Sequence, residues 1–139
     1  MGRYLVVANQ TLGGEQLRDE LRSRAESDGD ASFHVLVPAT PPDQFTFHTE
    51  GEAIAVAEDR LEEARRRFGD LGAEVTGEVG DANPVAAVGD ALREGDYDEV
   101  ILSTLPPGIS KWLGMDLPSR IQRSVDLPVT LVTGEPAEA

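Results

Sequence analysis

Two short segments of the 139-residue sequence contain residue types that suit the binding of small anionic ligands. The first covers residues 9–14, where amide and hydroxyl side chains precede two glycines. The second covers residues 103–111 and contains three hydroxyl residues, a glycine and the single lysine of the chain. Such side chains, with the N–H groups that glycine exposes, can hold a phosphate. The candidate binding residues are Asn9, Ser103, Thr104, Gly108, Ser110 and Lys111.

A purely structural interpretation of the second segment competes with this one. Pro106, Pro107 and Gly108 follow one another, and this combination is typical of a tight turn. Ser110 and Lys111 are then ordinary surface residues. The sequence alone leaves both interpretations open.

Hydrophobic periodicity and turn residues indicate the elements that position these segments. Strands are expected at residues 4–8, 33–37, 73–79, 99–103 and 127–132. Helices are expected between them, near residues 17–25, 52–71, 84–95 and 118–125. Strict alternation of strand and helix predicts an α/β domain, in which a parallel sheet is covered by helices on both faces.

The longest predicted helix has an apolar stripe that is expected to face the core. Its members recur at the spacing of one helical face. They are Ile54, Ala57, Leu61, Ala64, Phe68 and Leu71.

The predicted topology brings the two candidate segments together. In open parallel sheets, ligands bind beyond the carboxyl ends of the strands, where the strand order reverses. In a five-stranded doubly wound domain these are usually the loops after the first and fourth strands. Residues 9–14 and 103–111 are those loops.

The charge of the chain argues against two classes of partner. Twelve basic and 26 acidic residues give a net charge of −14. Such a surface repels the phosphates of nucleic acids and of anionic membranes, so neither is expected as a partner. The acidity itself is typical of a salt-adapted surface or of a GC-rich genome, and we assign it no function.

The cysteine content and the length of the apolar runs exclude further kinds of site and of location. The chain contains no cysteine, which excludes disulfides, thiolate nucleophiles and cysteine-based metal sites. No apolar run approaches the roughly 20 residues that cross a membrane. The apolar part of the amino-terminal segment is too short for a signal peptide. We therefore expect a cytoplasmic protein.

Other combinations of reactive residues have simpler interpretations. His34 and His48 lack metal-ligand spacing, so no metal site is expected. Ser103, His34 and Asp81 can be combined into a catalytic triad on paper, but no nucleophile-elbow motif supports one. Trp112 is expected to pack a loop over the core.

The sequence resembles the universal stress protein family over nearly its whole length. The resemblance rests on element order and on four phrases. They are residues 5–8 (LVVA), 80–82 (GDA), which lead into a helix, 100–102 (VIL) and 127–132 (LPVTLV).

The resemblance implies a specific architecture and assembly. It implies a three-layer α/β/α sandwich, of the adenine nucleotide alpha hydrolase-like kind, with strand order 3-2-1-4-5. Residues 1–134 would form this domain, and residues 135–139 are expected to be a disordered tail. Many family members dimerise through the last strand, which implies a homodimer through residues 128–132.

The sequence departs from the family's ATP-binding pattern, which is Gly, two residues, Gly, nine residues, Gly and then Ser or Thr. Ser103 and Pro106 stand where the first two glycines belong. Met115 and Asp116 replace the closing pair, in an alignment that needs one gap. Asn9 or a neighbour replaces an acid that members usually carry after the first strand.

These departures lead to two hypotheses. The first is a non-enzymatic, cytoplasmic protein with a stress-linked regulatory or binding role and no ATP bound in the usual family mode. The alternative is a member that binds ATP or AMP through a variant loop formed by the six candidate residues. A hydrolase or transferase would need an activated nucleophile or base, and the sequence motifs indicate none.

Overall fold

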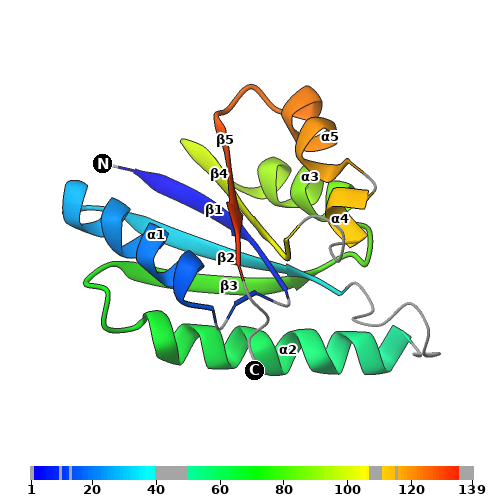
Figure 1. Ribbon diagram of the computed structural model, residues 1–139, viewed down its shortest axis with the longest axis horizontal. Helices are drawn as coiled ribbons and strands as arrows, with labels where there is room; N and C mark the ends of the chain where they lie inside the picture. Colours follow the sequence, from blue (N-terminus) through cyan, green and yellow to red (C-terminus); the bar gives the residue numbers. More distant parts are fainter. Residues whose placement is uncertain are drawn as a thin grey trace.

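Five parallel strands form the central sheet, and their order is β3-β2-β1-β4-β5 (Figure 1). The computed structural model describes residues 2–9, 11–12, 14–39, 50–106, 111–114 and 116–134. The strands are β1 (Arg3–Val7), β2 (Ser32–Pro38), β3 (Glu74–Gly80), β4 (Glu99–Thr104) and β5 (Val129–Thr133). The helices are α1 (Glu15–Ser27), α2 (Glu50–Phe68), α3 (Pro84–Glu94), α4 (Lys111–Gly114) and α5 (Leu117–Ser124).

The helices cover both faces of the sheet (Figure 1). One apolar cluster joins α1 and α2 to the first face, with Leu21 and Phe68 among its fully buried members. A second cluster joins α3, α4 and α5 to the opposite face through residues such as Val88, Trp112 and Ile121. The chain is therefore an α/β/α sandwich, and the predicted fold class and strand order are confirmed.

Strand β1 lies in the middle of the sheet and is buried on both faces. Val6 contributes to the first cluster, whereas Leu5 and Val7 contribute to the second. This placement explains why the sequence of β1 is a continuous apolar run, since a central parallel strand has no solvent-facing side. Leu5 pairs with His34 of β2 and with Val100 of β4. Hence β1 and β4 run side by side and end at the same edge.

The start of α3 follows from its sequence. The Asn83 side chain accepts hydrogen bonds from the backbone N–H groups of Val85 and Ala86, which caps the helix. Pro84 occupies the first turn, where its missing N–H has no helical partner to lose.

A glycine in the edge strand β3 lets α2 approach the sheet closely. A Cβ atom on Gly77 would lie 2.4 Å from Leu61 Cδ1 and 3.0 Å from the Val35 carbonyl oxygen. Both distances are shorter than van der Waals contact. A residue with a Cβ would require the Leu61 side chain to move, so the position favours glycine.

Two expectations about the elements need correction. Ile54 was expected in the buried stripe of α2 but is 37% exposed, because it lies in the amino-terminal part of the helix and outside the buried clusters. The short helix α4 was not predicted, since four residues carry too little periodicity. Other members of the stripe, Ala57, Ala64 and Phe68, are buried as expected.

Some expectations fall on residues that the structure does not describe. These are the loop at residues 40–49 with His48, the turn at residues 107–110 and the tail at residues 135–139. Among the described helices, none combines the length and the apolar character that crossing a membrane requires.

Candidate functional site

Four polar residues are buried where β1 and β4 end. Asn9 and Thr11 follow β1, while Ser103 and Thr104 are the last residues of β4. Their exposed fractions are between 1% and 5%. We call these four residues the strand-end cluster. The structure thus brings together the predicted residues Asn9, Ser103 and Thr104 and adds Thr11.

Asn9 connects three elements through its side-chain amide. Its Nδ2 donates a hydrogen bond to the carbonyl oxygen of Pro38, the last residue of β2, at 2.8 Å. Its Oδ1 accepts a hydrogen bond from Nη1 of Arg60, which lies on α2. Asn9 therefore ties the end of β1 to the end of β2 and to a helix that covers the sheet.

Thr11 and Ser103 join the segment after β1 to the end of β4. Their hydroxyl oxygens are 2.6 Å apart, so one hydroxyl donates a hydrogen bond to the other. Both residues are almost fully buried, at 2% and 1% exposure. A buried hydroxyl needs a hydrogen-bond partner, and here the two hydroxyls are partners of each other.

Thr104 is likewise bonded within the protein. Its Oγ1 donates to the carbonyl oxygen of Leu105 at 2.9 Å. Its own carbonyl oxygen accepts from the N–H of Gly134, beyond β5, at 2.9 Å. These bonds hold the end of β4 in place.

The backbone around the cluster is also paired. The Leu12 N–H donates to the Asn9 carbonyl, and the Gly14 N–H donates to the Thr11 carbonyl. At the end of β2, the Ala39 N–H donates to the Gly80 carbonyl at 3.1 Å. Within the described residues, many polar groups that a ligand would meet at this edge are bonded to the protein.

The remaining candidate residues are described only in part or not at all. Gly108 and Ser110 lie outside the described residues. Lys111 is the first residue of α4. The next residue, Trp112, is 7% exposed and packs into the cluster under α3 and α5, which confirms its expected role in the core.

Asp116 adopts a backbone conformation that usually belongs to glycine. Its φ is 57° and its ψ is 44°, which is the left-handed region. It is the residue before α5. An aspartate thus occupies a backbone conformation that glycine adopts more easily.

Ser103, His34 and Asp81 do not form a catalytic triad in the structure. His34 instead bonds the edge strand β3: its Nδ1 is 2.8 Å from Thr76 Oγ1 and its Nε2 is 2.6 Å from Glu78 Oε2. Ser103 is bonded to Thr11. Within the described residues, no group of three or more His, Cys, Asp or Glu side chains is placed to hold a metal ion.

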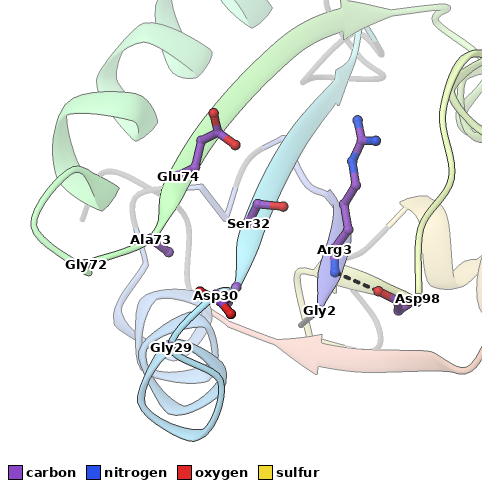
Figure 2. Close-up of a pocket in the computed structure, with 10 residues that line it drawn as sticks. Gly2, Arg3, Gly29, Asp30, Ser32, Gly72, Ala73, Glu74 and Asp98 are labelled. Carbon is purple, nitrogen blue, oxygen red and sulfur yellow. Dashed lines mark hydrogen bonds between the residues drawn. The ribbon is translucent and has the colours of Figure 1, made fainter.

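A hollow of about 540 Å³ lies at the opposite end of the sheet (Figure 2). It is lined by the first residues of three strands, Arg3, Ser32 and Glu74, and by neighbouring loop residues. Arg3 donates its backbone N–H to Asp98 Oδ2 at 2.8 Å on one side of it. Because ligands of open parallel sheets bind at the carboxyl ends of the strands, we place the candidate site at the strand-end cluster and not here.

Sequence reasoning missed two of the groups that shape the site. Thr11 lay inside a candidate segment, and its position between Asn9 and the glycines was an available signal. Arg60 gave no signal, because its role depends on the packing of α2 over residues that are far away in the sequence.

The sequence matches no protein-family model and no curated protein. In three dimensions it is similar to a universal stress protein from Archaeoglobus fulgidus, with a TM-score of 0.65, 17% identity and coverage of 96% of this chain and 94% of that chain. The dAMP complex of the universal stress protein from the same organism gives a TM-score of 0.65, 16% identity and coverage of 96% and 98%. A universal stress protein family member from Arabidopsis thaliana with AMP bound gives 0.67, 8% identity and coverage of 97% and 93%. This chain therefore has the fold of the universal stress proteins.

Proposed function

We propose that this chain is a universal-stress-type protein of the cytoplasm, which acts in a regulatory or binding role and not as an enzyme. We further propose that it does not bind ATP in the usual mode of that family. The strand-end cluster carries this proposal, because its polar side chains are bonded to one another and to the backbone.

A ligand at the ends of β1 and β4 would have to replace the bond between Thr11 and Ser103 or the bonds of Asn9. Replacing a buried hydrogen bond by an equivalent one gains little free energy, and leaving a partner unbonded costs about 1–3 kcal/mol. The cluster is thus better suited to holding the fold together than to receiving a triphosphate.

The sequence after β4 supports the same conclusion. Proline has no backbone N–H, so Pro106 and Pro107 cannot donate hydrogen bonds to phosphate oxygens. Asp116, which replaces part of the family's closing Gly-Ser pair, adds a carboxylate that would repel a triphosphate.

Purified protein tests the proposal directly. The protein is denatured, and the supernatant is assayed by chromatography for adenine nucleotides. We expect none in stoichiometric amount. One ATP for each chain would overturn the proposal.

A second candidate function is the binding of an adenine nucleotide through a variant loop. It is favoured by the AMP and dAMP that similar structures contain. The loop would use the six candidate residues Asn9, Ser103, Thr104, Gly108, Ser110 and Lys111. Stoichiometric AMP in the same supernatant assay would favour this function over the first.

We also propose that the protein forms a homodimer through residues 128–132. Strand β5 is an edge of the sheet, and Leu131 on it is 44% exposed. An edge strand offers unpaired backbone groups, and an exposed leucine adds an apolar contact. Light scattering during size-exclusion chromatography is expected to give a dimer, and a monomer at micromolar concentration would contradict this proposal.

Two variants test which surface is used. Leu131→Asp places a charge at the proposed contact and is expected to give a monomer. Ile54→Asp is the matched control, because Ile54 is similarly exposed but lies on α2. A dimer that survives Leu131→Asp and is lost with Ile54→Asp would locate the interface on the helix instead.

A further inference from the structure

Strand β3 forms one edge of the sheet, and among the described strands it pairs with β2 alone. Its seven residues stay in register with β2 from Glu74 to Gly80, so no bulge interrupts the strand. The strand also contains no proline and no lysine. Bulges, prolines and lysines are the usual means by which proteins keep an edge strand from pairing with another chain. The described part of β3 therefore lacks these protections.

The backbone groups that could pair with a further strand can be identified. At the end of β3, the Gly80 carbonyl oxygen accepts a hydrogen bond from the N–H of Ala39, which follows β2. Backbone groups point to alternate sides along a strand, so every second residue before Gly80 also faces β2. The N–H and C=O groups of Val75, Gly77 and Val79 consequently point away from the sheet.

A hollow of about 360 Å³ lies beside the start of this edge, between β3 and α2, which run side by side (Figure 1). It is lined by residues from the carboxyl-terminal part of α2 and from the chain that leads into β3, namely Glu62, Arg65, Arg66, Gly69, Ala73 and Val75. The half-buried side chains of Val75 and Val79 point to the same side as the hollow, since they pack against the first apolar cluster. A strand added to β3 would place every second side chain on this side.

The hollow contains a cation whose charge is not compensated. Arg65 is exposed, and within the described residues it forms no ion pair. Arg66, in contrast, pairs with Glu63, and its Nη1 lies 3.8 Å from Glu62 Oε1. The one acid in the lining is thus directed to Arg66, and the guanidinium of Arg65 remains available. Guanidinium groups bind carboxylates through two parallel hydrogen bonds.

We propose that β3 and the carboxyl-terminal part of α2 form a docking surface for an acidic peptide segment of another protein, which adds to the sheet as a strand beside β3. Hydrogen bonds to the backbone of Val75, Gly77 and Val79 supply affinity, and a carboxylate bound by Arg65 supplies specificity. The net charge of −14 repels an acidic peptide from the rest of the surface, which favours this patch. The proposal goes beyond the proposed function and involves neither a nucleotide nor the opposite edge at β5.

The other face of β3 restricts the peptide further. Thr76 and Glu78 contact His34 on that face, and the alternation of side chains places Glu74 there as well. Carboxylates at two of these positions repel an acidic neighbour on the same face. The peptide should therefore carry its acidic and apolar residues at alternate positions, with uncharged residues between them.

A peptide of sequence ETVTVTE, blocked at both ends, is the probe. In an extended strand its glutamates and valines share one face, and its threonines share the other. A glutamate at each end brings a carboxylate to the hollow whether the peptide runs parallel or antiparallel to β3. The peptide QTVTVTQ has the same shape without the charges. Fluorescence anisotropy measures affinity, and NMR of isotope-labelled protein locates binding through the backbone amides of Val75, Gly77 and Val79. The absence of saturable ETVTVTE binding would overturn the proposal.

Arg65→Gln tests the specificity of the surface. It should weaken the binding of ETVTVTE about tenfold, the factor that corresponds to one charged hydrogen bond, and leave that of QTVTVTQ unchanged. Arg123→Gln is the matched control, because Arg123 is also an exposed arginine in the last turn of a helix, with no ion pair within the described residues. Equal affinity of ETVTVTE for the two variants would overturn the proposal.

Val75→Pro tests strand addition itself. The Val75 N–H points away from the sheet, so proline removes a donor to the peptide without removing a bond to β2. We expect at least about tenfold weaker binding of both peptides, with the thermal unfolding transition retained. Unchanged binding would overturn the proposal. A change of oligomeric state in light scattering would assign this edge to a second copy of the chain and would overturn it as well. Should Val75→Pro fail to fold, the exposed substitution Arg65→Gln still decides the outcome.

Discussion

The hydroxyls of Thr11 and Ser103, 92 positions apart in the sequence, lie 2.6 Å from each other in the interior of the protein. The bond connects the segment after β1 with the end of β4, at the edge where a ligand would be expected. Neither hydroxyl reaches water, since both residues are at most 2% exposed. The contact therefore closes this edge and contributes to stability at the same time.

Removing one hydroxyl should cost more than removing both. Ser103→Ala leaves the Thr11 hydroxyl buried without this partner, which should lower the free energy of unfolding by about 1–3 kcal/mol. Thr11→Val with Ser103→Ala removes the unsatisfied group, so the double variant should lose less than the sum of the two single losses. Urea denaturation of the four proteins measures this coupling. Additive losses would show that the two hydroxyls are not bonded, and Ser27→Ala on exposed α1 surface serves as the control.

An ion pair between α1 and β4 should make stability depend on pH. Arg24 Nη2 lies 2.6 Å from Glu99 Oε2, and Thr130 Oγ1 also donates to Glu99. Burial alone would raise the pKa of the Glu99 carboxyl, but the hydrogen bonds from Arg24 and Thr130 outweigh it and lower the pKa. The stabilisation is thus present above the unfolded pKa of about 4.3 and is lost as the pH falls through the lower folded pKa.

Glu99→Gln removes this pH dependence. It should lower the free energy of unfolding at neutral pH by about 1–2 kcal/mol, because a charged hydrogen bond becomes a neutral one. The difference from the unaltered protein should shrink on acidification below about pH 4. Denaturation curves across this range provide the measurement, with Glu63→Gln as the control, since Glu63 pairs with Arg66 on the exposed face of α2. A difference that stays constant with pH would contradict the assignment.

The left-handed backbone at Asp116 should be improved by glycine. With φ at 57°, Asp116 pays a conformational cost that glycine avoids. Asp116→Gly is expected to raise the free energy of unfolding by about 0.5–1 kcal/mol. The converse change is Gly72→Ala, since Gly72 has φ of 79° and no atom within 4 Å of an added Cβ. It should destabilise by about 1 kcal/mol. A lower thermal stability of Asp116→Gly, or a higher one of Gly72→Ala, would contradict the backbone argument.

Much of the fold could be predicted because its signals are local or periodic. The apolar run before Asn9, the stripe that contains Ala57, and Pro84 after a capping residue each indicate an element. Alternation of these elements then dictates a parallel sheet. Ile54 shows the limit of such reasoning, because periodicity identifies a face of the helix but not how far the sheet extends beneath it.

The gathering of polar residues at one edge of the sheet could also be predicted, but the hydrogen bonds among them could not. Topology places Asn9 and Ser103 at one edge of the sheet. The partners that occupy them, Arg60 and Thr11, depend on distances set by packing across the whole domain. The sequence therefore indicates which polar residues gather at this edge but not that they are already bonded.

Calorimetric titration of the purified protein with ATP, and then with AMP, tests the central claim most directly. We predict no saturable heat with ATP, because the strand-end cluster is internally bonded and Pro106 and Pro107 offer no backbone donors. Stoichiometric ATP binding that is weakened by Ser103→Ala would contradict the claim and would make this edge of the sheet a working nucleotide site.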